Sequence, residues 1–377
     1  MKPKGPRHSN ALVVPLAATL LVCVARCASA SESGAAAASV LNSTPRRPQL
    51  DAPAAPPPPE ISLPNGQHLL FAKKELQVPP HLRLMVFAPH PDDETLGAGG
   101  LIQRVLATGG KVRVVFVTNG DGYVDGVRVE AHRAETHASD FIEYGERRHD
   151  EALRAAQDIG LSASDTVFLG FPDDGIDDLW AAHWSDDRPY VSPYTRFAHP
   201  PYKDSLSRRV EYAGSDLKEE ITRTLRAFRP NWVILPDPRD RHPDHCTTGV
   251  FVLDALRELR EERGDWFDRT QALTYLVHYP DYPSSAAWIR EIEGAGIGGS
   301  LTAGRVLTAA PWLTLPLTAG ELATKQQAIA AYHTQVQVMK PFLAQFLRRG
   351  FELFAHLDAT QVATVPREYA ARFRRPK

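Results

Sequence analysis

Four ionisable residues follow an apolar run within five positions, in the segment VFAPHPDDETLGAGG that spans residues 86–100. They are His90, Asp92, Asp93 and Glu94. Ionised groups at the end of a buried strand are costly unless something pairs with them, and a bound cation is the leading candidate. His90 and Asp93 offer a nitrogen and an oxygen to a metal, while Asp92 points elsewhere because successive residues in a turn diverge. One carboxylate can therefore bind metal while its neighbour transfers protons.

A second polar cluster, PDPRDRHPDH at residues 236–245, directly follows the apolar segment NWVILP. Parallel strands place their carboxyl ends on one edge of a sheet, so two clusters far apart in sequence converge there. His90, Asp93 and one histidine of the second cluster would make three ligands with an open position for water, as in catalytic zinc sites. Either cluster alone fits an ordinary polar turn, but two clusters at strand ends favour a metal.

The elements that must position these clusters alternate between strands and helices. Near-continuous apolar runs predict buried strands, and helical patterns lie between them. This alternation predicts an α/β, Rossmann-like fold with a mostly parallel sheet and helices on both faces. Asp216 with Glu219, and Thr318 with Glu321, look like helix-capping pairs, and Pro230 ends one helix. The predicted strands are 82–88, 111–118, 166–171, 231–236 and 273–279.

The amino-terminal segment has the features of a signal peptide. Basic residues precede an apolar run of about 15 residues, which is shorter than the roughly 20 that a membrane span needs. We expect cleavage after Ala30, export to the periplasm or the outside, and no stable membrane span in the mature chain. An uncleaved anchor is the alternative. Residues 31–65 are rich in proline and alanine and predict a disordered linker, and residues 66–377 form the folded domain.

Cysteine content and charge argue against a disulfide-stabilised protein and against a nucleic-acid-binding protein. Cys246 is the one cysteine outside residues 1–30, so the mature chain has no intramolecular disulfide. Residues 1–30 hold four of the 43 basic residues and none of the 45 acidic ones, so without them the net charge changes from −2 to −6. No basic patch indicates nucleic acid.

Together these segments resemble the LmbE-like, or PIG-L, family of zinc-dependent de-N-acetylases. The resemblance rests on APHPDDETLGAGG and HPDH, and it continues through RRHDEALRAAQDIGL, which is similar to the family's Arg-x-x-Glu helix. It covers about residues 80–280, and KQQAIAAYHTQ beyond them is similar but less diagnostic.

The resemblance implies a role for each residue of the two clusters. His90, Asp93 and His245 would bind one Zn²⁺ per chain, and Asp92 would be the general base. His242 would stabilise the oxyanion as a charged imidazole or protonate the leaving amine, and Asp244 would orient His242. Zinc lowers the pKa of its water to about 7 and polarises the amide carbonyl.

Further polar residues are candidates for substrate contact. Arg148 matches the arginine of the Arg-x-x-Glu pattern and would contact a sugar or headgroup, unless it is a surface arginine paired with Glu151. Asp121, Asp173 and Asp174 follow predicted strands, so they either hold sugar hydroxyls or cap turns. The substrate-binding candidates are Arg148, Asp121 and Asp174.

Several other residues are expected to be passive. His278 is expected to be a hydrogen-bonded core residue, and Cys246 has no assigned base. Arg241 either reaches an anionic substrate or is solvated. GAGIGG at residues 294–299 matches a dinucleotide-binding pattern but follows a helix-like segment, so we assign it to a loop. His132, His137 and His149 are expected to be solvated.

We therefore expect a zinc-dependent hydrolase that removes an N-acetyl or similar acyl group from an amino sugar or glycoconjugate, preferably of the N-acetylglucosamine type. Its partner would be a small-molecule or glycan substrate. One alternative is hydrolysis of another amide or an ester at the same centre. The other is a non-catalytic carbohydrate-binding relative, against which Asp92 and His242 argue because binding needs neither a base nor an acid.

The exported protein should begin near Ser31, because the predicted cleavage site ends at Ala30. Mass spectrometry of the amino terminus in fractionated cells checks this. An intact Met1 on the exported protein would contradict it.

Overall fold

The computed structural model describes residues 60–62, 68–70, 74–238, 240–262, 266–278, 312–348 and 350–357. Eight of the described strands form one sheet in the order β3-β9-β10-β8-β7-β4-β5-β6, and β1 (Glu60–Ser62) pairs separately with β2 (His68–Leu70). The strands of the large sheet are β3 (Lys74–Glu75), β4 (Arg83–Ala88), β5 (Lys111–Thr118), β6 (Thr166–Phe171), β7 (Trp232–Pro236), β8 (Gln271–Tyr275), β9 (Trp312–Pro316) and β10 (Phe351–Leu357).

The sheet is mostly parallel, as the sequence predicts. Strands β8, β7, β4, β5 and β6 pair in parallel, and β3 pairs in parallel with β9. Strand β10 runs antiparallel to both β8 and β9. The sequence did not predict β9 or β10, and it placed β8 at residues 273–279 where the strand is Gln271–Tyr275.

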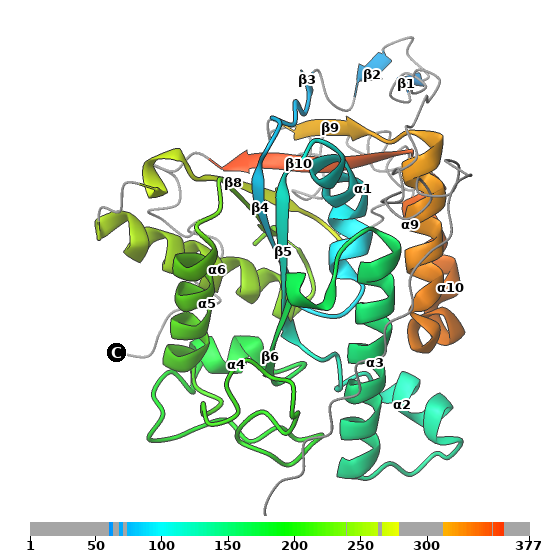
Figure 1. Ribbon diagram of the computed structural model, residues 1–377. Coiled ribbons are helices and arrows are strands. Elements are labelled where there is room, and N and C mark those ends of the chain that lie inside the picture. The colour runs from blue at the N-terminus through cyan, green and yellow to red at the C-terminus, as the bar shows by residue number, and fades with distance from the viewer. Residues whose placement is uncertain are drawn as a thin grey trace, which may run out of the picture. The chain divides into compact units, whose positions relative to one another are not determined.

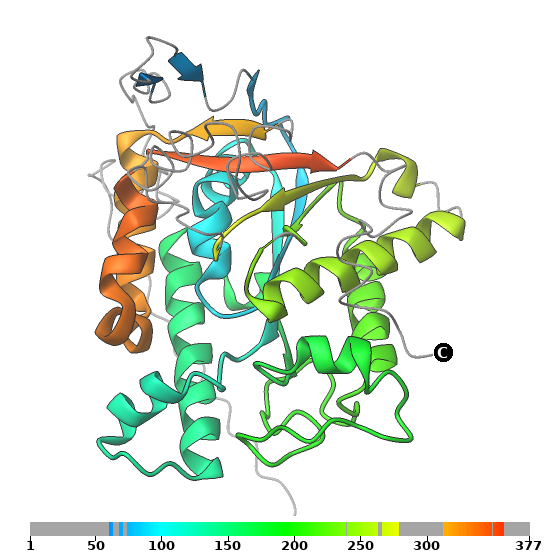
Figure 2. The ribbon, with the colours of Figure 1, turned by 180° about the vertical axis from the view of Figure 1, so that it is seen from behind.

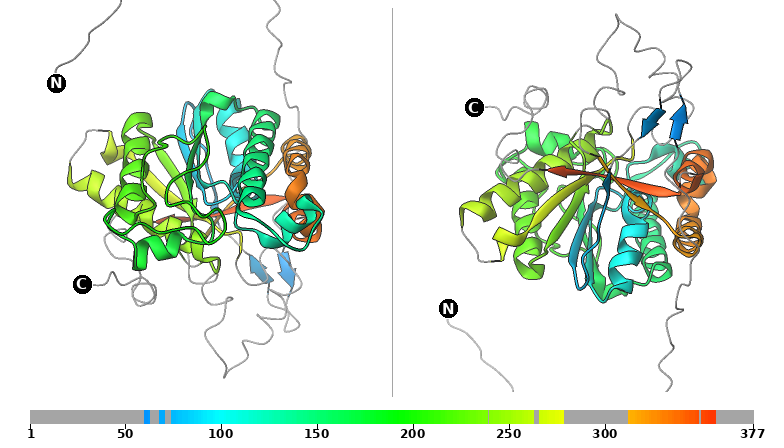
Figure 3. Two further views of the ribbon diagram at one scale, coloured as in Figure 1. Left: turned by 90° about the horizontal axis from the view of Figure 1, so that it is seen from below. Right: turned by 90° about the horizontal axis from the view of Figure 1, so that it is seen from above.

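Helices cover both faces of the sheet, as Figures 1 and 2 show, because alternate residues of each strand pack on opposite sides. In β4, Leu84 and Val86 join one core cluster and Met85 and Phe87 the other. The views along the sheet in Figure 3 show the cyan, teal and orange helices on one side and the green ones on the other. The helices are α1 (Asp93–Ala107), α2 (Val124–Ala131), α3 (Ala138–Asp158), α4 (Ile176–Ala181), α5 (Gly214–Phe228), α6 (Pro243–Glu261), α9 (Ala319–Ala331) and α10 (His333–Arg348).

Two of the predicted helix boundaries are confirmed and one is wrong. Thr318 and Glu321 form a reciprocal capping box at the start of α9. Helix α5 ends at Phe228, two residues before Pro230. Helix α5 begins at Gly214, however, so Asp216 lies inside its first turn, and its carboxylate accepts the backbone N–H of Glu211 at 2.9 Å.

The strand order places two loops together. The chain proceeds from β4 to β5 to β6 toward one edge of the sheet and then returns to β7 on the other side of β4. The carboxyl ends of β4 and β7 are therefore neighbours at the point where the strand order reverses. Open α/β sheets bind their ligands at such a point.

Several sequence predictions lie outside the described residues. These are the signal peptide, most of the linker and the GAGIGG segment. Strand β1 lies inside the predicted linker, so a short strand occurs where the sequence predicted none. Among the helices of the described chain, none combines the length and the apolar character that a membrane crossing requires.

Helix α1 approaches β8 closely because Gly97 has no side chain. A Cβ atom on Gly97 would lie 2.2 Å from Cδ2 of Tyr275, whose hydroxyl donates to the backbone oxygen of Phe87 at 2.9 Å. A Cβ atom on Gly99 would meet its nearest neighbour, Cγ2 of Thr95, at an ordinary 3.6 Å. The two glycines therefore differ in the space around them.

Gly97→Ala should destabilise the fold by about 1–3 kcal/mol, because the methyl group must displace the buried Tyr275 ring. Gly99→Ala is the matched control and should raise stability by about 0.5–1 kcal/mol, since alanine favours a helix interior. Denaturant unfolding of both variants measures the difference. Equal stability of the two would show that the contact between α1 and β8 is not tight.

Candidate metal and catalytic site

The loop after β4 is held by the buried Glu94. Its carboxylate accepts hydrogen bonds from the hydroxyls of Tyr332 and Thr95 and from the backbone N–H of Asp92. Asp92 precedes α1 with φ 128° and makes no side-chain cap to the helix. This backbone conformation is rare for a non-glycine residue.

The loop after β7 is held by the buried Asp240. Its carboxylate accepts the backbone N–H groups of Val277 at 2.9 Å, His278 at 3.0 Å and His242 at 3.1 Å. Burial opposes ionisation of Asp240, but the neighbouring His245 lowers its pKa to about 2. His242 caps the amino terminus of α6, and His245 lies fully buried in the first turn of that helix.

Three ligand atoms from the two loops form a nearly equilateral triangle. His90 Nδ1 lies 3.2 Å from His245 Nε2 and 3.3 Å from Asp93 Oδ2, and His245 Nε2 lies 3.2 Å from Asp93 Oδ2. Zinc held at about 2.0–2.1 Å in tetrahedral geometry separates its ligand atoms by about 3.3–3.4 Å. The donor types and their spacing therefore fit a zinc ion with three protein ligands and a fourth open position.

Carboxylates face the far nitrogens of both triangle histidines. Oδ2 of Asp240 lies 3.5 Å from His245 Nδ1, and His90 Nε2 lies 3.0 Å from Oδ1 of Asp173 and 3.2 Å from Oδ2 of Asp244. Such partners fix the ring orientation and tautomer of metal-binding histidines. Among the described residues, three groups of three histidine or carboxylate side chains have potential ligand atoms within 4.8 Å of one another. One of these groups contains His90, His242 and His245.

A cavity of about 300 Å³ opens beside the triangle. Its polar wall comes from the strand loops and includes His90, Asp92, Asp173 and His242. The apolar residues that line it include Leu96 of α1 and, from α10, Met339 and Phe342. The sequence reasoning missed the α10 residues because that helix lies far along the chain and carries no polar motif at Met339.

Asp92 lines this cavity and is only 6% exposed. Burial and the neighbouring Asp93 carboxylate raise its pKa to about 8, against the opposing effect of Arg148 and His90. Its Oδ2 lies 3.7 Å from an Arg148 nitrogen. A divalent cation at the triangle would act in the same direction as Arg148 and favour the ionised carboxylate.

His242 lies at the cavity with its ring centroid 4.9 Å from that of His90. Burial, together with the nearby His90 and His245, lowers its pKa to about 3. This shift favours the neutral imidazole, and a charged His242 remains a prediction. A neutral ring can still donate a hydrogen bond through one nitrogen.

The Asp244 carboxylate does not contact His242, although the sequence analysis expected it to orient that ring. The Asp244 carboxylate faces His90 and accepts the backbone N–H groups of Asp174 at 2.7 Å and Ile176 at 3.1 Å. Only its backbone N–H reaches Nδ1 of His242, at 3.3 Å. The side chain of Asp244 therefore orients His90, because the first turn of α6 directs it toward the loop after β6.

Arg148 is neither a surface residue nor the partner of Glu151. It is 3% exposed, and its guanidinium donates to the backbone oxygens of Gly120 at 2.8 Å and Pro91 at 2.7 Å. Glu151 instead accepts the backbone N–H and the hydroxyl of Thr334 at the start of α10. Arg148 thus ties the loops after β4 and β5 together and places a positive charge beside Asp92.

The acidic candidates separate into two groups. Asp173 and Asp174 line the cavity, and Asp174 accepts a hydrogen bond from the hydroxyl of Tyr194 at 2.7 Å. Asp121 is buried and does not line the cavity, and its Oδ2 accepts the hydroxyl of Tyr202. Substrate contact remains a prediction for both Asp174 and Asp121, of which only Asp174 lines the cavity.

The remaining histidines and Cys246 differ partly from expectation. His278 is half-buried at the cavity and stacks on Phe342 with ring centroids 5.1 Å apart, so it is not a core residue. His132 and His137 are exposed as expected, but His149 is half-buried against Phe168. Cys246 is buried, with its thiol 2.8 Å from the backbone oxygen of Pro238, and Arg241 is exposed.

The family described as PIG-L, GlcNAc-PI de-N-acetylase, matches residues 85–256, which contain the triangle, Asp92 and His242. Residues 85–256 are therefore similar to a PIG-L domain. A 1D-myo-inositol 2-acetamido-2-deoxy-alpha-D-glucopyranoside deacetylase from Kribbella flavida is 27% identical over 292 residues, which cover 73% of this chain and 90% of the relative. A diacetylchitobiose deacetylase from Thermococcus kodakarensis is 26% identical over 46% of this chain and 49% of the relative.

Solved structures similar to the chain include an N,N'-diacetylchitobiose deacetylase from Pyrococcus horikoshii, with a TM-score of 0.46 and 17% identity over 76% of this chain and 87% of that chain. The conserved protein TT1542 from Thermus thermophilus has a TM-score of 0.44 and 21% identity, over 74% of this chain and 95% of that chain. Cavity residues His278, Met339 and Phe342 lie beyond residues 85–256, the segment that the family model matches.

Replacing any one of the three proposed zinc ligands by alanine should lower zinc occupancy, because the two remaining side chains bind the ion more weakly than three. The variants are His90→Ala, Asp93→Ala and His245→Ala, with the exposed His199→Ala as the control. Elemental analysis of the purified proteins measures the zinc. Full occupancy in all three variants would contradict the ligand assignment.

Proposed function

We propose that the chain is a zinc-dependent N-deacetylase of amino sugars, with one Zn²⁺ held by His90, Asp93 and His245. The triangle of ligand atoms beside a cavity that also contains Asp92 and His242 is the observation that carries this proposal. The PIG-L match and the two deacetylase relatives support the reaction class.

The reaction adds water to the amide carbonyl carbon, breaks the carbon–nitrogen bond and yields a carboxylate and a free amine. Zinc, when bound, would polarise the carbonyl and acidify the attacking water. Asp92 accepts the proton of that water through a carboxylate that lines the cavity next to the ligand Asp93. Arg148 keeps this carboxylate in place and favours its ionised form.

His242 acts on the tetrahedral intermediate. Its ring lies beside His90 at the cavity, where it donates a hydrogen bond to the oxyanion or, once protonated, passes a proton to the departing nitrogen. Amide hydrolysis needs such a proton, because an amide anion is too basic to leave. Asp92, once protonated, is the second source of that proton.

The cavity favours a sugar substrate of modest size. Carboxylates such as Asp173 and Asp174 can accept hydroxyl hydrogen bonds, while Met339 and Phe342 offer apolar surface to the opposite side of a ring. We propose an N-acetylglucosamine-type sugar or glycoconjugate for these reasons. Hydrolysis of a different amide or an ester at the same centre is the second candidate, since the zinc-site chemistry is common to both.

A panel assay separates these candidates. The zinc-loaded protein is incubated with N-acetyl-D-glucosamine, diacetylchitobiose, acetylated envelope glycans and a simple acetyl ester, and both acetate and the new amine are measured. Release of acetate with a stoichiometric amine from an acetamido sugar supports the proposal. Turnover of the ester alone would favour the second candidate, and no turnover of any compound would favour a binding protein.

Export to the periplasm or the outside is part of the proposal and rests on the signal-like segment at residues 1–30. Deleting residues 2–30 should leave the protein inside the cell. A glycan of the cell envelope would be an accessible substrate at the proposed location.

Asp92→Asn should retain zinc and lower kcat by about 100-fold or more, because asparagine is nearly isosteric but cannot accept the proton of water. His242→Ala should also retain zinc, and its effect should fall on kcat more than on KM if the ring acts on the intermediate. Zinc content and kinetics of both variants are measured beside the wild type. Near wild-type turnover of zinc-loaded Asp92→Asn would show that Asp92 is not the general base. Glu94 or zinc-bound hydroxide alone would then have to account for proton removal from the water.

A further inference from the structure

His278 lines the cavity of about 300 Å³ beside the triangle, the catalytic cavity, but has no role in the mechanism above. It lies just after β8, whereas the segment that the family model matches ends at residue 256. Its backbone N–H donates to the buried carboxylate of Asp240 at 3.0 Å, and its backbone oxygen accepts the N–H of Arg241 at 3.1 Å. The loop after β7 therefore fixes the position of this residue.

Aromatic contacts hold the His278 ring against the catalytic site. The ring stacks on Phe342 of α10, with ring centroids 5.1 Å apart and an angle of 5° between the two planes. It meets the ring of His245 edge to face at 4.8 Å and lies 5.2 Å from the ring of His242. Contacts with three rings limit how the imidazole of His278 can turn.

The ring nitrogens of His278 are available to a ligand. Within the described part of the chain, the hydrogen bonds of this residue are those of its backbone, so neither ring nitrogen has a partner there. Neither nitrogen is among the enclosed polar atoms of the described interior, and the ring lines the cavity. Polar groups that are largely buried are nearly always hydrogen-bonded. The free imidazole therefore indicates a partner that enters the cavity.

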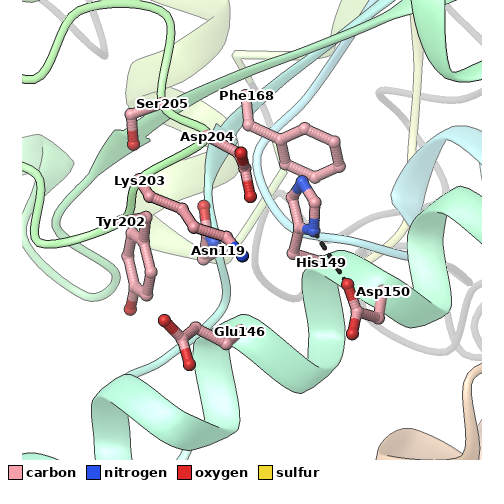
Figure 4. A pocket seen from close by; sticks show the side chains of 9 residues that line it. All are labelled: Asn119, Glu146, His149, Asp150, Phe168, Tyr202, Lys203, Asp204 and Ser205. Carbon is pink, nitrogen blue, oxygen red and sulfur yellow. Dashed lines mark hydrogen bonds and ion pairs between the residues drawn. The ribbon is translucent and has the colours of Figure 1, made fainter. Parts of the chain in front are cut away.

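His149 provides a comparison with a histidine in a similar aromatic environment. Figure 4 shows its ring beside Phe168, in a second cavity that shares no lining residue with the catalytic cavity. The two ring centroids lie 4.1 Å apart, and His149 Nδ1 lies 3.3 Å from Oδ1 of Asp150. Both histidines are half-buried against a phenylalanine, but of the two only His278 leaves both nitrogens without a protein partner.

A ring nitrogen of His278 lies close to the triangle but outside it. Together with a ring nitrogen of His245 and a carboxylate oxygen of Asp93, it forms a group whose atoms lie within 4.8 Å of one another. His242 forms such a group with His90 and His245. The rings of His242 and His278 therefore flank different pairs of the proposed zinc ligands. Because the His278 ring makes no hydrogen bond or ion pair to another described residue, it is a neighbour of the site and not a fourth ligand in this geometry.

We propose that His278 is a catalytic residue that donates a hydrogen bond to the carbonyl oxygen of the substrate amide. When the water oxygen bonds to the carbonyl carbon, an electron pair of the C=O bond moves to the carbonyl oxygen, and the N–H of His278 stabilises the new negative charge. His278 keeps its proton.

This assignment divides two functions between two rings. The proton that the departing nitrogen needs comes from His242 or Asp92, while His278 bonds the oxyanion. An imidazole carries at least one N–H group whether it is neutral or charged, so the role of His278 does not depend on its protonation state. The identity of the carbonyl group as an amide rests on the proposed function.

Acetohydroxamate tests the hydrogen bond without turnover, because its carbonyl oxygen resembles that of an acetamide. Calorimetric titration of the zinc-loaded full chain measures its affinity. His278→Phe keeps a flat ring on Phe342 but removes both nitrogens, and it should weaken binding about three- to tenfold. His278→Gln retains an N–H donor and should lose about twofold or less. His149→Phe is the matched control outside the catalytic cavity and should bind as the wild type does.

Kinetics on the acetamido sugar that the panel assay identifies give a second readout. His278→Phe should lower kcat about 100-fold, as for the loss of one oxyanion donor. KM should change less, since the negative charge develops only after attack on the carbonyl carbon. His278→Gln should recover part of the rate. Zinc content should equal that of the wild type in both variants, and loss of zinc from His278→Phe would overturn the proposal by making the ring a ligand.

Crystals of the zinc-loaded wild type with acetohydroxamate should place a His278 nitrogen within about 3.2 Å of the hydroxamate carbonyl oxygen. A separation too long for a hydrogen bond, or equal acetohydroxamate affinity of the wild type and His278→Phe, would overturn the proposal. If no compound of the panel is turned over, the proposed function fails, while the acetohydroxamate affinities still decide whether His278 is a donor to a carbonyl oxygen at this site.

Discussion

Three electron-pair donors lie within 3.3 Å of one another at the carboxyl ends of β4 and β7: His90 Nδ1, Asp93 Oδ2 and His245 Nε2. Donors at this spacing are stabilised by a cation between them, and the spacing matches that of zinc ligands. Much of the surrounding structure keeps these atoms in place. The reversal of strand order makes the two loops neighbours, and Asp240 and Asp244 orient the two histidine rings.

The carboxyl-terminal part of the chain supports the same loop from the other side. Tyr332 binds Glu94 directly, and Lys325 and Glu352 form a buried ion pair whose Nζ and Oε1 atoms lie 2.6 Å apart. This pair also bonds the backbone of α1, because Lys325 donates to the oxygen of Leu96 and Glu352 accepts the N–H groups of Gly100 and Leu101. Helix α1, which begins at the proposed ligand Asp93, is therefore anchored by α9 and β10.

The sequence predicted much of the sheet and the closeness of the two polar clusters, because both depend on local signals. Apolar runs identify buried strands, and β5 and β6 match their predicted ranges residue for residue. Histidines and carboxylates directly after such runs reach one edge of the sheet through topology alone. The same reasoning could not find β10, whose antiparallel pairing depends on partners far along the chain.

Side-chain partners were harder to predict than positions. Arg148 and Glu151 are one helical turn apart, which suggests a pair, yet each bonds to a different loop. Asp244 follows His242 closely, but its carboxylate points to His90 because it lies in the first turn of α6. His278 and Phe342 reach the cavity from segments whose patterns carry no metal or catalytic motif. Such contacts are decided by packing between distant elements.

X-ray absorption at the zinc edge of the metal-loaded protein tests the central claim most directly. The triangle predicts one zinc ion per chain with two histidine nitrogens and one carboxylate oxygen at about 2.0–2.1 Å, and a further light atom from solvent. A sulfur ligand, a zinc shell without histidine, or an ion bound without a free solvent position would contradict it.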